Sequence, residues 1–442
     1  MTSPLPVSAM AENPPAIRAV SLPSRPVVLY GTIGLLLFGP LAFGTTEPWS
    51  QFLLEAGSAS LAAFWAIQQV KSGALRIRWN PLFAPMLAFG VLVVLQIVSC
   101  QTASTEHTLS AALLFTSYAL LCFLLAQTLQ HVRQLNWIAR TVSIYGAAAA
   151  LFALVQGFSS DGKLYWLRQP YFEGWIYGPY VNHNHYAGLM EMLAPVPLVI
   201  ALSRRCSTQQ RWLASIAASI MATSILFSRS RGGMVAFAAE IALLAVLLLR
   251  HNPRSKTMGA IAAFVLLTMA LALWMGDSEL IQRLGSIHSQ ARSELYGGTR
   301  LSIDRDALRM FAQKPILGWG LGSFPEVYPQ FRSFYTNLRV EHAHNDYLEL
   351  LVETGMAGFL VAVWFLVIMF RAAAKELRQR EWGTNGLAQI AALVGISGIL
   401  VHSLVDFNLQ IPANAAIFYA LCVLAAMKQQ SAVASNQLKN HS

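Results

Sequence analysis

Long apolar stretches alternate along the chain with short polar connections. A run of roughly 20 apolar residues is long enough to cross a lipid bilayer as a helix. Counting such windows gives twelve candidates, at residues 27–44, 52–70, 81–99, 109–127, 135–157, 185–202, 211–228, 232–250, 257–275, 348–370, 386–404 and 411–428. The pattern therefore predicts an all-α integral membrane protein with about twelve transmembrane helices.

Composition agrees with this prediction, because 55% of the 442 residues are hydrophobic and only 12% are charged. An ordinary soluble protein of this size is less apolar. The first 25 residues are rich in proline and serine without an apolar core, which indicates a disordered tail and not a cleaved signal peptide. The four cysteines have no repeated spacing, so neither a disulfide framework nor a zinc site is indicated.

Lysine and arginine lie mainly on every second connection between the candidate helices. By the positive-inside rule, these connections and both termini are cytoplasmic. The predicted organisation is a cytoplasmic tail at 1–26, helices one to nine at 27–275, a large external loop at 276–347, helices ten to twelve at 348–428 and a second cytoplasmic tail at 429–442.

The segment SRSRGG at 228–233 is an exception to the charge rule, because it places Arg229 and Arg231 at the outer end of two apolar helices. A charge costs about 2 to 3 kcal/mol at mid-membrane and less near the surface. One interpretation is that both side chains reach into lipid head groups. The other is an anion site, since guanidinium binds phosphate bidentately and Gly232 and Gly233 let a ligand approach the backbone.

The external loop is basic, which suits an anionic partner. Its cations are Arg283, Arg292, Arg300, Arg305, Arg309, Lys314, Arg332 and Arg339. Within it, TRLSIDRDALRMFAQ predicts an amphipathic helix with Leu301, Leu308 and Phe311 on its apolar side, ending before Lys314 and a glycine-rich turn. Such a helix lies flat on a membrane surface, where its arginines have anionic lipid as an alternative partner.

Two His-x-His pairs occur, at His183 and His185 and at His342 and His344. They lie in unrelated segments and lack a carboxylate-containing metal signature, so no metal site is expected. The first pair ends an aromatic-rich stretch at 165–186, which is typical of an interfacial aromatic belt and, as the alternative, of a platform that stacks sugars.

Residues 341–351 read EHAHNDYLELL at the entrance to the tenth candidate span. If the substrate is a sugar on a lipid diphosphate, the leaving group needs cations and the attacking hydroxyl needs a base. Histidine suits this role because its pKa lies near neutrality, and His344 is the candidate, with His342 as the other. A glycosidase needs two carboxylates flanking one bond. Here Asp346 and Glu349 predict a capping box instead, and Glu349 is also a candidate for orienting a histidine.

At this point the chain resembles a known family, the bacterial O-antigen ligases, within the O-antigen ligase and polymerase superfamily. Their signature is a histidine, an Asn, Ser or Gln, nine residues and Gly-x-x-Gly, and it stands here as His344, Asn345, DYLELLVET, Gly355 and Gly358. SRSRGG and the TRLSID…PILGWGLGSF stretch support the resemblance, which covers most of 27–428. One detail differs: Arg300 is followed four residues later by Asp304, where the family pattern has leucine.

The resemblance implies a GT-C-like glycosyltransferase of lipopolysaccharide biosynthesis in the inner membrane, with its site and large loop in the periplasm. It would transfer O-antigen polysaccharide from undecaprenyl diphosphate to the lipid A core oligosaccharide, with inversion and without metal or cofactor. His344 or His342 would be the base, and Arg229 or Arg231 with Arg300 would hold the diphosphate. Asn345 and Glu349 would orient these groups. The expected partners are the two lipid substrates and inner-membrane lipids, and no nucleic acid.

Three alternatives stay open at this stage. An O-antigen polymerase uses the same donor with a second lipid-linked glycan as acceptor, and a protein O-oligosaccharyltransferase uses a protein. A lipid-linked glycan transporter belongs to a different class, and its cations are expected to line a cavity at the membrane midplane.

Overall fold

A computed structural model of the chain describes residues 25–73, 75–160, 162–169, 176–203, 205–251, 255–274, 299–337, 339–378 and 384–427. Several predicted features therefore lie outside the described residues. These are residues 1–24 and 429–442 of the tails, residues 276–298 of the external loop with Arg283 and Arg292, and residues 170–175 of the aromatic stretch.

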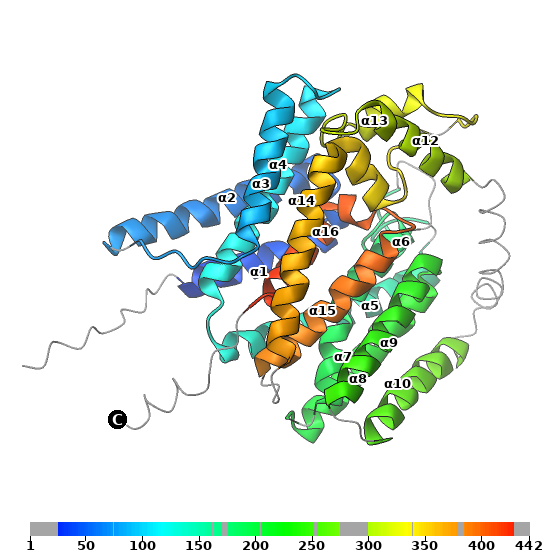
Figure 1. Cartoon of the computed structure of the whole chain (residues 1–442). Coiled ribbons are helices and arrows are strands. Elements are labelled where there is room, and N and C mark those ends of the chain that lie inside the picture. Colours follow the sequence, from blue (N-terminus) through cyan, green and yellow to red (C-terminus); the bar gives the residue numbers. More distant parts are fainter. Residues whose placement is uncertain are drawn as a thin grey trace, which may run out of the picture.

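Every regular element in the described part of the chain is a helix, as predicted (Figure 1). The α-helices are α1 (Arg25–Leu41), α2 (Pro48–Lys71), α3 (Phe83–Val98), α4 (Thr105–Thr128), α5 (Val132–Ser159), α6 (His183–Leu193), α7 (Pro195–Leu202), α8 (Thr208–Phe227), α9 (Arg231–His251), α10 (Ser255–Trp274), α12 (Thr299–Gln313), α13 (Phe324–Val327), α14 (Asp346–Leu377), α15 (Thr384–His402) and α16 (Pro412–Ala425). Short 3-10 turns are η1 (Phe43–Thr45), η2 (Tyr328–Gln330) and η3 (Asn408–Gln410).

Each of the twelve apolar windows coincides with a helix, and α6 and α7 share one window. Within the residues that the structure describes, five helical segments are both long and apolar enough to cross a membrane: Thr105–Thr128, Val132–Ser159, His183–Leu202, Arg231–Arg250 and Asp346–Leu377. Four shorter apolar helices accompany them. These helices support the predicted integral membrane protein, while twelve crossings and a GT-C-like architecture stay predictions.

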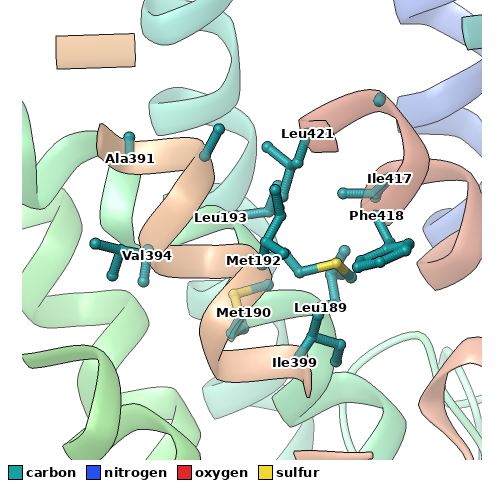
Figure 2. Close-up of a cluster of buried hydrophobic side chains, with 14 of the residues drawn as sticks. Leu189, Met190, Met192, Leu193, Ala391, Val394, Ile399, Ile417, Phe418 and Leu421 are labelled. Atoms are coloured by element: carbon teal, nitrogen blue, oxygen red, sulfur yellow. The ribbon is translucent and has the colours of Figure 1, made fainter. Parts of the chain in front are cut away.

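Buried apolar side chains of α6, α15 and α16 form one core (Figure 2). Met190 and Met192 of α6 and Ile399 of α15 have no exposed surface. Helices α6 and α15 approach closely because Gly395 has no side chain, and a Cβ there would lie 2.9 Å from the Met192 carbonyl oxygen. Helix α15 also packs against α9, so it contacts α6, α9 and α16 together.

A second, smaller cluster joins α12, α13 and η2 to the first turns of α14 at one end of the bundle (Figure 1). Helix α12 ends at Gln313, before the predicted stop. Its buried face is formed by Ile303, Ala307 and Met310, while Leu308 is 49% exposed. Leu308, which was predicted on the apolar side, therefore lies outside the face that packs against α13 and α14, and its contact with a membrane surface stays a prediction.

Helix α14 is interrupted at Gly355, where φ is +63° and ψ is −170°, a conformation that only glycine adopts readily. The loop before α13 supplies the missing hydrogen bonds. Trp319 N–H donates to the Val352 carbonyl (3.0 Å), and Met356 N–H donates to the Pro315 carbonyl (2.8 Å). The Gly-x-x-Gly part of the signature thus allows the loop to cross α14 and fixes its first turns, which carry the residues of the candidate site.

Candidate active site

Residues 341–345 lead into α14, and the Asn345 side chain accepts hydrogen bonds from Tyr347 N–H and Leu348 N–H. Asn345 is therefore the N-cap of α14. The predicted capping box between Asp346 and Glu349 is wrong, because the Glu349 side chain turns back to the loop. His344 has φ +53°, which is uncommon for a residue with a side chain and is held by the contacts around it.

Glu349 orients His342. Its Oε1 accepts a hydrogen bond from His342 Nδ1 (2.7 Å), and its Oε2 accepts one from Ala343 N–H (2.7 Å). The Glu349 side chain is 1% exposed and that of His342 is 27% exposed. Burial lowers the pKa of His342, but the Glu349 carboxylate outweighs burial, so the pKa is raised above its ordinary value. His342 is therefore the more cationic of the two loop histidines.

Asp406, in the connection between α15 and η3, is the acidic centre of the site. Its Oδ1 lies 3.9 Å from His344 Nδ1 and 3.7 Å from His185 Nε2. Its Oδ2 accepts a hydrogen bond from the Asn184 amide, and Phe407 N–H donates to Oδ1 (2.9 Å). Burial raises the pKa of Asp406, but the surrounding histidines outweigh burial and hold the pKa well below its usual range. Asp406 is thus a carboxylate among imidazoles.

His344 differs electrostatically from His342. Burial lowers its pKa, the Asp406 carboxylate opposes that effect, and the Arg300 guanidinium adds to it, so the pKa lies below the ordinary histidine value. Its side chain is 33% exposed. An imidazole that is neutral at physiological pH, accessible and next to a carboxylate is suited to accept a proton.

Three histidine rings contact the Phe407 ring. His342 stacks on it with ring centroids 4.3 Å apart, while His344 and His185 meet it edge to face at 4.9 and 4.6 Å. These residues come from α6, from the loop before α14 and from the connection after α15. One aromatic ring therefore sets the relative positions of side chains that lie far apart in the sequence.

Arg300, in the first turn of α12, reaches the same connection. Its guanidinium donates to the Val405 carbonyl (3.0 Å) and lies 3.9 Å from Asp406 Oδ2. The side chain is 44% exposed. The guanidinium is anchored on one side and remains open to a ligand on the other.

The SRSRGG turn lies against this region. His183 Nδ1 is 2.7 Å from the Ser228 carbonyl oxygen, and Arg229 has φ +60°. Ser230 Oγ accepts a hydrogen bond from Gly233 N–H (3.1 Å), which helps begin α9 at Arg231. Both arginines are half-buried. The start of α9 supplies N–H groups that favour an anion.

The structure thus gathers His342, His344 and Arg300 around Asp406 and Phe407, and Glu349 orients His342. The turn with Arg229 and Arg231 lies next to these residues, because His183 contacts the Ser228 carbonyl and Val405, the neighbour of Asp406, contacts Gly232. Asn345 serves the helix start. Sequence reasoning missed Asp406 and Phe407, although Asp406 is the one acid in a predicted external connection, 405–410, that has no cation.

The sequence indicates His185 only as half of a metal-type pair, yet the structure places it against both Asp406 and Phe407. Among the residues that the structure describes, no group of three or more His, Cys, Asp or Glu side chains is arranged to hold a metal ion.

The bundle of apolar helices with a polar site at one end is that of an integral membrane protein. Residues 216–363, about a third of the chain, match the family model described as O-antigen ligase. This match confirms the predicted resemblance to the O-antigen ligase family, and it supports a ligase- or polymerase-type function and a membrane enzyme of the glycosyltransferase kind. A search of curated proteins finds no match. The matched segment contains SRSRGG, Arg300, His342 and His344, and ends before Asp406.

Proposed function

We propose that the protein transfers O-antigen polysaccharide from undecaprenyl diphosphate to a sugar of the lipid A core, with inversion at the anomeric carbon. The reaction takes place at the periplasmic face of the inner membrane, and both termini are cytoplasmic. The family match supports a ligase- or polymerase-type function. The proposed roles of single residues rest on the convergence of His344, His342 and Arg300 on Asp406 and Phe407.

His344 is the general base. The acceptor hydroxyl attacks the anomeric carbon from the face opposite the diphosphate, the new C–O bond forms as the bond to the diphosphate oxygen breaks, and the hydroxyl proton passes to His344. Asp406, 3.9 Å from Nδ1, stabilises the imidazolium that results. General-base catalysis contributes typically 10² to 10⁴ in rate, about 3 to 5 kcal/mol.

The diphosphate leaves as an anion and is stabilised by cations. Arg300 supplies one open guanidinium, and Arg229 or Arg231 supplies the second from the SRSRGG turn. His342, whose pKa is raised by Glu349, adds positive charge beside the same group. The arginines and His342 thus stabilise the diphosphate, while neutral His344 accepts the proton. The proposed mechanism requires neither metal nor cofactor.

Reconstitution tests this function. Purified protein is incubated with undecaprenyl-diphosphate glycan and lipid A core, and separately with each lipid alone, and His344→Ala serves as the control. Glycosylated lipid A core only in the complete mixture is the expected result. Longer glycan chains from the donor alone indicate a polymerase, and movement of donor across vesicles without a new bond indicates a transporter. Either outcome would replace the proposed function.

A further inference from the structure

A buried carboxylate and imidazole form a pair inside the bundle, next to the candidate site. His402 Nδ1, at the end of α15, lies 3.0 and 3.2 Å from the two carboxylate oxygens of Glu191 on α6. The two side chains are 1% and 0% exposed. Ionisable side chains are costly in apolar helix bundles, where an apolar pair of similar volume packs helices equally well. Helix packing alone therefore does not explain the pair.

Both members of the pair contact the SRSRGG turn. A Cβ on Gly232 would lie 2.6 Å from the His402 ring, so the ring occupies the space directly against that glycine. A Cβ on Gly233 would lie 3.0 Å from Glu191 Oε1. The two glycines that follow Arg231 are thus needed for the turn to rest on the pair.

The same pair adjoins the connection that holds Arg300. His402 accepts a hydrogen bond from Val405 N–H (3.0 Å) through its carbonyl, and the Val405 side chain also lies against Gly232. The Val405 carbonyl in turn accepts the hydrogen bond from Arg300, and Asp406 follows directly. The His402 ring and Val405 therefore lie between the arginine turn and the Arg300 anchor.

We propose that the Glu191–His402 pair is a positioning unit for the lipid diphosphate: it sets the SRSRGG turn against Val405 and Asp406, so that its arginines and Arg300 bind one ligand. This inference rests on the proposed function for the identity of the ligand. The carboxylate fixes the ring through Nδ1, and the ring fixes the turn through Gly232. Neither side chain touches the reacting atoms.

Glu240 provides a matched control. It lies on α9, the helix that begins with Arg231, and is 1% exposed. Its carboxylate packs against Gly398 of α15, one helical turn before His402, and the two turn glycines are not among its close contacts. Replacing it removes a buried carboxyl group from the same helices. Glu240 interacts electrostatically with Glu191 but hydrogen-bonds to neither member of the pair, so the hydrogen bonds between Glu191 and His402 remain in Glu240→Gln.

The experiment compares Glu191→Gln, His402→Gln and Gly232→Ala with wild type and with Glu240→Gln. The dissociation constant for undecaprenyl diphosphate, the donor KM, the acceptor KM, kcat and the thermal midpoint are measured for each purified protein. The three test variants are expected to raise the donor KM and the dissociation constant about tenfold, with the acceptor KM changed less than about twofold. Glu240→Gln is expected to match wild type. Combining Glu191→Gln with Arg231→Ala should weaken donor binding by less than the product of the two single effects, because both act through one turn.

Unchanged donor binding in the pair variants would overturn the inference, as would an equal loss in Glu240→Gln or a lower thermal midpoint with an unaltered donor KM. Failure of the proposed function looks different. In that case wild type binds undecaprenyl diphosphate without transferring glycan, and the comparison of dissociation constants still decides the inference. A wild type that does not bind the lipid at all would contradict both.

Discussion

Replacing Glu349 by glutamine is expected to lower kcat/KM for glycan transfer by about 10- to 100-fold. Glu349 accepts two hydrogen bonds of 2.7 Å, from His342 Nδ1 and from Ala343 N–H, while 1% of its side chain is exposed. A glutamine side chain has only one carbonyl oxygen, so it can accept only one of these two hydrogen bonds. Its amide N–H then faces the remaining N–H donor, either His342 or Ala343. A hydrogen bond to a charged group contributes about 1.5 to 3 kcal/mol, and about 1.4 kcal/mol is tenfold.

The same substitution has a pH signature. The pKa of His342 is raised in the folded protein, so its charged contact with Glu349 stabilises the fold fully below the ordinary histidine pKa. That part of the stability is lost as pH rises through the raised pKa. The difference in thermal midpoint between wild type and Glu349→Gln should therefore be larger at pH 6 than at pH 9, which lie about half a unit below and about 2.5 units above the ordinary histidine pKa.

Transfer kinetics on purified protein, with thermal unfolding at both pH values, form the assay. Glu353→Gln is the comparison variant, because Glu353 lies one turn further along α14, is buried, and accepts a hydrogen bond from Phe324 N–H (3.0 Å). Glu353 interacts electrostatically with His342 and Glu349 but hydrogen-bonds to neither, so the variant separates the orienting hydrogen bonds from the charge of a neighbouring carboxyl group. Its kcat/KM should stay within about threefold of wild type. Glu349→Gln with wild-type kinetics and a pH-independent difference in midpoint would refute the orienting role of Glu349.

Three further predictions concern the donor, the metal and the helix break. Arg300→Ala and Arg231→Ala should each weaken binding of undecaprenyl diphosphate by about 1.5 to 3 kcal/mol; unchanged affinity in both variants would leave only contact with lipid head groups. EDTA should leave transfer intact, and a loss of activity that zinc restores would contradict the metal-free mechanism. Gly355→Ala should lower the thermal midpoint and the activity together, because a Cβ there would lie 2.3 Å from the Ile316 carbonyl oxygen at φ +63°; a fully stable, active variant would show that the break in α14 is dispensable.

The helices and the signature were predictable because both are local patterns. Apolar windows coincide with helices along the described chain, and the motif from His344 to Gly358 indicated the family, while the role of His344 as the base stays a prediction. Arg300 and His342 were predicted to take part in the site, and the structure brings both to Asp406 and Phe407.

What the sequence did not show depends on contacts between distant segments. Asp406 looks like an ordinary acid in a short connection, and its role emerges only when His185, His344 and Arg300 converge on it. Local rules also failed where tertiary contacts compete with them. Glu349 fits a capping box by spacing, but the loop histidine offers it a stronger partner, and Asn345 caps the helix instead.

The role of His344 as general base is tested by glycan transfer by His344→Ala, reconstituted with undecaprenyl-diphosphate glycan and lipid A core and compared with wild type at equal amounts of folded protein. Transfer is expected to be lost while the donor still binds, because the arginines that hold the diphosphate remain. Wild-type transfer by His344→Ala would show that His344 is not the base.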